Sequence, residues 1–122
     1  MEFVGAVGAD AWGQALGRLL ADLGVGSRGL QSHPTAPTRE VYVLSDKTGE
    51  RSFAGFSLPD PTGFADAHLI CDRIDPQLFT GTKYLVRGTL GLAYPQTRVA
   101  MLQAVDWINQ QNGRVVLDIN WR

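Results

Sequence analysis

Residues 84–119 carry a pattern that few folds can accommodate: an apolar run, an amphipathic stretch and a second apolar run. The first run is Tyr84-Leu85-Val86 and the second is residues 114–119. Pro95 suits the first turn of a helix, and Gly113 suits its end. Between them, apolar residues recur at helical spacing: Val99, Met101, Leu102, Val105 and Ile108. Strands joined through one helix form a crossover and lie parallel, so the sequence predicts an α/β fold with a buried parallel sheet.

The N-terminal residues show a further strand and helix. Residues 3–8 are short, apolar and bounded by Gly, which is typical of a buried strand. Asp10 stands where a helix N-cap belongs, and Gly24 provides a C-terminal stop. Apolar residues recur at helical spacing between them: Trp12, Leu16, Leu19, Leu20 and Leu23. Gly, Ser and Pro interrupt residues 25–37, so we expect an irregular segment there.

Residues 39–56 predict a β-hairpin. The stretches 39–44 and 51–56 are strand-like, and residues 46–50 between them have the composition of a turn. Alternate positions of the first strand are apolar on both faces, which an edge strand with one face in water does not require. The hairpin is therefore either a plain sheet edge or, as the two apolar faces favour, a lid that covers a ligand on one face and meets a partner on the other.

The segment between the hairpin and the last strand–helix unit has a weaker pattern. Residues 57–63 contain two prolines and predict a loop. Residues 64–81 leave loop and helix open, with a short helix after Pro76 as one alternative.

Charge and motifs exclude several classes of function. A formal net charge of -1 offers no electrostatic footprint for nucleic acid, and no run reaches the ~18 apolar residues of a membrane span. The single Cys71 cannot form an intrachain disulfide, which favours a cytoplasmic setting. Residues 24–29 spell G-x-G-x-x-G, but they follow a helix and lead into a loop, so they do not fit a dinucleotide site. We expect His33 and His68 to be structural, and no metal site is predicted.

The final residues hold the clearest candidate site. Asp118, Asn120 and Arg122 alternate along an extended chain, so their side chains share one face. They stand at the carboxyl end of a parallel strand, where open α/β sheets bind ligands. A carboxylate, an amide and a guanidinium can hold sugar hydroxyls and neutralise phosphate charge. The alternative is a solvated strand end with Asp118 accepting from loop amides.

Five segments together resemble ribokinase- and fructokinase-type (PfkB) sugar kinases. Residues 3–13 resemble the G-x-VG-x-D-x-x-G stretch of that family, and residues 38–56 resemble its lid strands. Residues 23–25 resemble the "GV" after its helix, and residues 88–92 resemble its "GT" loop. Residues 118–122 resemble its D-x-N-x-R. The resemblance implies that residues 1–122 form part of a ribokinase-like, Rossmann-type sheet flanked by helices. The hairpin 39–56 would be its lid, and residues 84–122 would be a βαβ unit.

The activity that this resemblance implies is transfer of the γ-phosphoryl group of ATP, with Mg²⁺, to a hydroxyl of a sugar such as fructose. It assigns substrate contacts to Tyr42, Thr89 and the D-x-N-x-R residues Asp118, Asn120 and Arg122. It also implies a cytoplasmic or plastid enzyme that dimerises through its lid.

Two family motifs have no counterpart in the chain. They are a Gly-Gly and Asn stretch that helps to hold the sugar, and a G-A-G-D motif that supplies the anion hole and the catalytic base. We therefore expect an internal fragment of a kinase, inactive alone, and assign it no catalytic residue. A small non-catalytic ligand-binding or interaction module on an α/β scaffold is the alternative.

Overall fold

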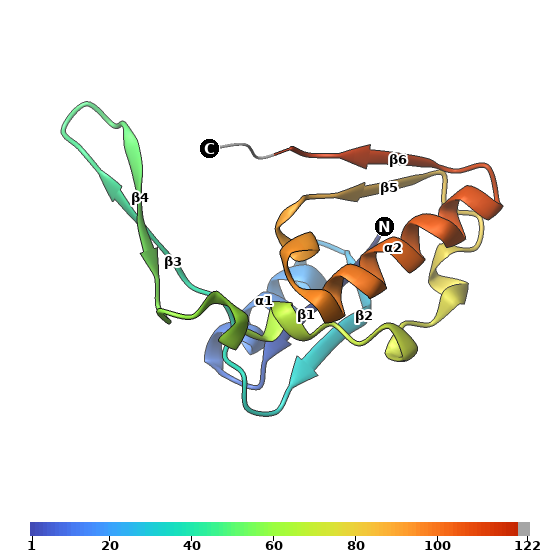
Figure 1. Ribbon diagram of the computed structural model, residues 1–122, viewed down its shortest axis with the longest axis horizontal. Coiled ribbons are helices and arrows are strands. Elements are labelled where there is room, and N and C mark those ends of the chain that lie inside the picture. Colours follow the sequence, from blue (N-terminus) through green and yellow to red (C-terminus); the bar gives the residue numbers. More distant parts are fainter. Residues whose placement is uncertain (120–122) are drawn as a thin grey trace.

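The computed structural model describes residues 1–119 and contains two α-helices, six strands and five short 3₁₀ helices (Figure 1). The first half contains β1 (Glu2–Gly8), α1 (Ala11–Asp22), β2 (Gly26–His33), β3 (Val41–Ser45) and β4 (Arg51–Phe56). The second half contains β5 (Tyr84–Arg87), α2 (Pro95–Gln110) and β6 (Arg114–Leu117). The 3₁₀ helices are η1 (Pro61–Gly63), η2 (Ala65–His68), η3 (Cys71–Arg73), η4 (Pro76–Phe79) and η5 (Leu90–Ala93). No helix within residues 1–119 is long and apolar enough to cross a membrane.

The strands form three pairs within this part of the chain. β1 pairs with β2 in parallel, β5 pairs with β6 in parallel, and β3 pairs with β4 in the antiparallel sense. The predicted crossover through α2 and the predicted hairpin are thus confirmed. The β3–β4 hairpin projects away from the other elements (Figure 1). Of the two alternatives left open for residues 64–81, the short helix at Pro76 is present as η4.

Strand β2 corrects the prediction of an irregular segment over residues 25–37. Gly29 lies directly against β1, where an added Cβ would stand 2.7 Å from Cγ2 of Val4. Small residues therefore let β2 approach β1 closely, and pairing with β1 outweighs the low strand propensity of Gly and Ser. The G-x-G-x-x-G run leads from α1 into this strand, so it still lacks the strand-to-helix position of a phosphate-binding loop.

Both helices begin as the sequence predicts. The carboxylate of Asp10 accepts a hydrogen bond from the Gly13 N–H at 2.8 Å and caps α1. Gly24 follows α1 in the left-handed conformation, with φ of 67°. Pro95 opens α2, but the helix ends at Gln110, and Asn112, with φ of 58°, takes the left-handed position expected near Gly113.

The core lies between α2 and the segment 69–79, and it corrects the predicted faces. The face of α2 that packs inward consists of Thr97, Ala100, Ala104 and Ile108. Val99 and Leu102, predicted to face the core, are 60% and 48% exposed. Small residues at i, i+4 spacing allow α2 to approach the chain beneath it, which the larger residues would prevent. Most of the apolar side chains expected to be buried in α1, at its C-cap and in β5 are also exposed: Trp12, Leu16, Leu19, Leu23, Tyr84 and Val86.

Candidate functional site

One carboxylate ties Thr38, the residue two before Glu40 at the base of the hairpin, to the end of β1 and the start of α1. Besides capping α1, Asp10 accepts from the N–H of Thr38 at 2.7 Å and from its hydroxyl at 2.8 Å. The Thr38 hydroxyl oxygen in turn accepts from the Gly8 N–H at 2.9 Å. The Thr38 and Gly13 amides hold the pKa of Asp10 below its ordinary value. The residue that precedes the hairpin is therefore fixed to the carboxyl end of β1.

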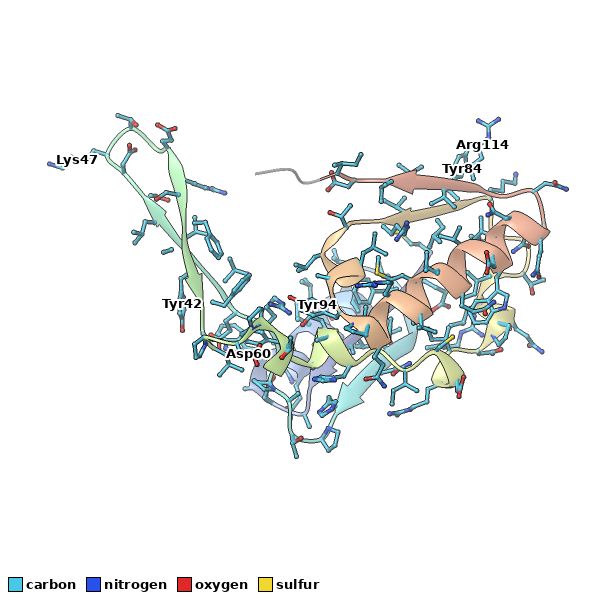
Figure 2. All side chains as sticks on the ribbon, viewed as in Figure 1. Tyr42, Lys47, Asp60, Tyr84, Tyr94 and Arg114 are labelled. Atoms are coloured by element: carbon cyan, nitrogen blue, oxygen red, sulfur yellow. The ribbon has the colours of Figure 1, made fainter. Side chains whose placement is uncertain are left out.

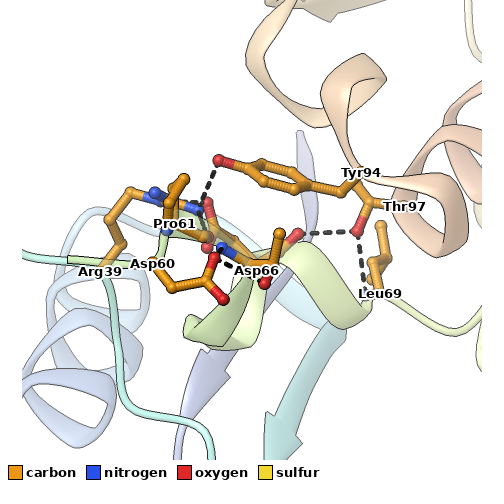
Figure 3. Close-up of polar contacts among 8 residues, drawn as sticks. Arg39, Asp60, Pro61, Asp66, Leu69, Tyr94 and Thr97 are labelled. Atoms are coloured by element: carbon orange, nitrogen blue, oxygen red, sulfur yellow. Dashed lines mark hydrogen bonds and ion pairs between the residues drawn. The ribbon is translucent and has the colours of Figure 1, made fainter. Parts of the chain in front are cut away.

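Arg39 fixes the base of the hairpin to the body of the chain (Figure 3). Its Nε donates to Oδ2 of Asp66 at 2.7 Å, and Nη2 donates to the carbonyl of Pro61 and the hydroxyl of Tyr94 at 2.9 and 3.0 Å. Its guanidinium lies over three aromatic rings at 4.4 to 5.2 Å, those of Phe56, Phe64 and Tyr94. Only 8% of the Arg39 side chain is exposed, so the hairpin is anchored by a buried cation.

Thr97 joins this anchor to α2. Its hydroxyl donates to the carbonyl of Asp66 at 2.7 Å and accepts from the N–H of Leu69 at 3.1 Å (Figure 3). The sequence does not indicate that Arg39, Asp66 and Thr97 act together, because no local pattern joins residues so far apart in the chain. The sequence gives one indication of the anchoring role of Arg39, which is that it directly follows Thr38 at the start of the hairpin.

The predicted substrate residues lie in two places. Thr89 follows β5 and precedes η5, while Asp118 follows β6 and donates its backbone N–H to the carbonyl of Arg87 at 2.9 Å. Since Arg87 pairs with Leu117, Thr89 and Asp118 share the carboxyl edge of this strand pair. Tyr42 is 52% exposed on the projecting hairpin, apart from that edge (Figure 2). Asn120 and Arg122 lie outside the described residues.

The histidines and acidic residues do not form a metal site in the described part of the chain. No three His, Cys, Asp or Glu side chains gather there in a way that could hold a metal ion. The rings of His33 and His68 lie 5.1 Å apart, but Nδ1 of His33 accepts from the Ala36 N–H at 2.8 Å and so serves the turn. Residues 1–119 therefore form no metal cage built from protein side chains alone, an arrangement that Mg²⁺ does not need where one or two carboxylates and substrate phosphates hold it.

Comparison with sequence models of known protein families shows to which family this chain belongs. The model for pfkB family carbohydrate kinases matches residues 1–122, the whole chain. The chain belongs to the pfkB family. The resemblance seen in the five sequence segments is thereby confirmed.

Individual pfkB relatives match almost all of this chain, but the chain spans only about a third of their length. Fructokinase-1 of Zea mays is 28% identical over 120 residues, which are 98% of this chain and 36% of the relative. The crystal structure of fructokinase from Xylella fastidiosa with bound ATP superposes with a TM-score of 0.84 at 25% identity, covering 99% of this chain and 36% of that one. A putative ribokinase II of E. coli in complex with ATP and Mg²⁺ shares the fold at 23% identity, with a TM-score of 0.83 and coverage of 99% and 37%. The fold is therefore ribokinase-like, as a partial domain.

The first prediction concerns Asp10, whose carboxylate joins the start of α1 to Thr38. Asp10→Asn should lower the free energy of unfolding by about 1 kcal/mol at pH 7, since an amide nitrogen in place of Oδ2 cannot accept from the N–H of Thr38. Asn can still cap α1 through its oxygen. Because the folded state lowers the pKa of Asp10, its stabilisation is complete above the ordinary value of 3.8 and is lost as pH falls through the folded pKa. Urea unfolding between pH 2 and 6 should show a shallower acid loss for Asp10→Asn than for the wild type. Asp22→Asn, at the other end of α1, is the control; equal pH profiles for the two variants would contradict the role of Asp10.

Proposed function

We propose that the protein of which these residues form part is an ATP-dependent sugar kinase that phosphorylates fructose. The observation that carries the proposal is the match of the pfkB model to all 122 residues, together with relatives that are named fructokinases. ATP in the Xylella enzyme supports ATP as the phosphoryl donor. The single Cys71 is compatible with a reducing, cytoplasmic setting.

In this proposal, the carboxyl edge of β5 and β6 binds the sugar. Thr89 and Asp118 share that edge. The Thr89 hydroxyl can donate to and accept from sugar hydroxyls, and the Asp118 carboxylate can accept from them. Asn120 and Arg122 follow at alternate positions, so Asn120 would hold a further hydroxyl and Arg122 would neutralise charge on the sugar or on the transferring phosphate. Tyr42 would cover the sugar from the hairpin. Mg²⁺, when bound in the parent enzyme, neutralises charge on the phosphates.

Turnover by the parent enzyme tests this function. With ATP, we expect it to phosphorylate fructose faster than glucose or ribose, and Arg122→Lys should lower kcat/KM at least about tenfold because Lys lacks the planar fork. Arg28→Lys, at an exposed residue of β2, is the matched control and should leave kcat/KM unchanged. The isolated 122-residue chain, measured alongside, should give no turnover. Absence of sugar phosphorylation by the parent would refute the function, and equal effects of the two variants would remove Arg122 from the site.

The hairpin is proposed to meet a second copy of itself in a two-fold dimer. Every residue of β3 is exposed, including the apolar Val41, Val43 and Leu44. Apolar side chains on both faces of a projecting hairpin need cover from ligand or protein, and a second hairpin would provide a self-complementary surface.

Sedimentation of the chain tests this association. Replacing Val41 and Val43 together with Lys should shift the equilibrium towards monomer, since charge on that face opposes the contact. The substitution should change the free energy of unfolding by less than about 0.5 kcal/mol, because both residues are half exposed. The matched control places Lys at Val99, an exposed apolar residue of α2. A monomeric wild type, or a double variant that associates equally strongly, would rule out the hairpin as the interface.

A further inference from the structure

The loop that carries Thr89 is held at its far end by the anchor of the hairpin. This 88–93 loop follows β5 and ends with η5, and Tyr94 comes directly after it. Tyr94 is 5% exposed, and its hydroxyl accepts a hydrogen bond from Nη2 of Arg39 at 3.0 Å (Figure 3). The end of the loop at α2 is therefore fixed to the same buried cation that holds the base of the hairpin.

The near end of the 88–93 loop begins at a second, partly buried cation, Arg87. Leu85 and Arg87 share the partly buried face of β5, whereas Tyr84 and Val86 are exposed. Nε and Nη1 of Arg87 are buried and have no hydrogen-bond partner among residues 1–119. Guanidinium N–H groups that leave water without gaining an acceptor cost free energy, and a counter-charge offsets that cost best. An acidic partner for Arg87 is therefore favoured.

Asp66 provides the acceptor that Arg87 lacks. Its Oδ2 accepts from Nε of Arg39 at 2.7 Å, but its Oδ1 is buried and has no partner within residues 1–119. Asp66 and Arg87 line the same cavity of about 340 Å³, and they are the only charged residues among the described ones that line it. Most of the remaining lining is apolar, including Ala100 and Met101 of α2, so no other charge there competes for Arg87.

We infer that Arg87 pairs with Oδ1 of Asp66 in the parent enzyme, so that the Arg39–Asp66 anchor holds the 88–93 loop at both ends. In the described residues Asp66 pairs with Arg39 alone, and the second pair forms by rotation about the side-chain bonds of Arg87. One contact then supplies two buried N–H groups with an acceptor and a buried oxygen with a donor. A bridging water molecule would serve the hydrogen bonds but leave the charges apart.

This pair makes Arg87 a positioning residue for Thr89, a role that rests on the proposed binding of a sugar at the carboxyl edge of β5 and β6. With both ends of its loop fixed, the Thr89 hydroxyl is held near Asp118 at that edge. The hairpin base and the loop also share Asp66 as a partner. Contact of a sugar with Thr89 is therefore coupled to the placement of the hairpin.

A double-mutant cycle in the parent enzyme tests the pair. Asp66→Asn and Arg87→Met are made alone and together, and the unfolding equilibrium constant is measured in urea. We expect the two effects to be non-additive by about tenfold or more. Arg114→Met, at an exposed position on β6 (Figure 2), is the control and should be additive with Asp66→Asn. Additivity of Arg87→Met and Asp66→Asn would overturn the inference. Stabilisation of the wild type, but not of Arg87→Met, by inorganic phosphate would mean that Arg87 binds an anion instead, and would equally overturn it.

Turnover tests the positioning role. Arg87→Met should raise the KM for the sugar about tenfold and leave the KM for ATP unchanged, because Thr89 serves the sugar. In a Thr89→Ala background, the same substitution should change the KM for the sugar by less than about twofold, since the side chain that Arg87 positions is already absent. Equal effects in both backgrounds, or an effect on the KM for ATP alone, would show that Arg87 does not act through Thr89.

Arg87→Lys covers the case in which the parent with Arg87→Met does not fold. Lys keeps the positive charge but loses the planar fork, so it should retain part of the contact with Asp66. Its cost in the free energy of unfolding should be greater in the wild-type background than in the Asp66→Asn background. Equal costs in the two backgrounds would rule out the pair.

Failure of the pair and failure of the proposed reaction can be told apart. The urea cycle requires no turnover, so absence of sugar phosphorylation would refute the kinase function and leave the coupling between Arg87 and Asp66 as measured. Additivity in urea, together with normal phosphorylation of the sugar, would refute the pair alone.

Discussion

Replacing Arg39 with Met is expected to lower the free energy of unfolding by about 3 kcal/mol. The guanidinium is almost fully buried and pairs with Asp66, whose side chain is one-third exposed. Removing it leaves the Asp66 carboxylate without its cation and releases two hydrogen bonds, to Pro61 and Tyr94. Met preserves apolar volume beside the aromatic rings but loses the cation–π contribution. Because Asp66 is partly exposed, water can hydrate its carboxylate once the cation is removed. The expected loss of free energy therefore lies at the lower end of the range for a broken buried ion pair.

Urea unfolding of two matched variants measures the effect. Arg28→Met breaks the pair between Arg28 and Glu2, in which Arg28 is 66% exposed, and should cost under about 1 kcal/mol. The double variant Arg39→Met/Asp66→Asn should recover part of the loss, because no unpaired charge then remains. Similar losses for Arg39→Met and Arg28→Met would show that the buried pair does not anchor the hairpin.

Gly13→Ala is expected to destabilise the chain by about 2 to 3 kcal/mol, although Ala is the better helix former by about 1 kcal/mol. Gly13 lies in the first turn of α1, and a Cβ there would overlap the carbonyl oxygen of Gly8. The same Cβ would stand 3.1 Å from the hydroxyl oxygen of Thr38. Backbone cannot yield as a flexible side chain can, so α1 must move away from the end of β1 and disturb the tie between Asp10 and Thr38.

A second glycine of the same helix provides the control. A Cβ on Gly17 would meet only Cδ2 of Leu30, at an ordinary 3.9 Å. Gly17→Ala should therefore stabilise the chain by about 0.5 to 1 kcal/mol. Thermal and urea unfolding of both variants test this. The free energy of unfolding should fall for Gly13→Ala and rise for Gly17→Ala. A rise in the free energy of unfolding for both variants would show that α1 is not held tightly against β1.

Local chemistry made much of the fold predictable. The Asp10 cap, the glycine after α1, Pro95 and the turn at residues 46–50 act over a few residues, so their effects are readable in the chain itself. In that turn, the Asp46 carboxylate accepts from the N–H groups of Thr48 and Glu50, both within four residues. The crossover from β5 to β6 was equally predictable, because its spacing and handedness follow from general geometry.

The candidate site was predictable only in part. The alternation at Asp118 and the loop at Thr89 indicated a strand edge, and the structure brings these two residues to the same edge. Tyr42 was correctly placed on the hairpin, while its contact with a sugar stays a prediction. Asn120 and Arg122 lie outside the described residues, so their contacts with a sugar stay predictions from the sequence motif.

Only the tertiary structure decided which segments pair and which faces are covered. Strand β2 forms because Gly29 can lie against Val4, and the inward face of α2 is set by Ala100 and Ala104 against a segment that the sequence left ambiguous. Arg39 and Asp66 meet across 27 residues, and Thr97 and Asp66 across 31. Capping and periodicity are contacts between near neighbours, so the sequence alone determines them. Strand pairing and buried ion pairs depend on the free energy of contacts between distant residues, which no local pattern records and only the folded chain brings together.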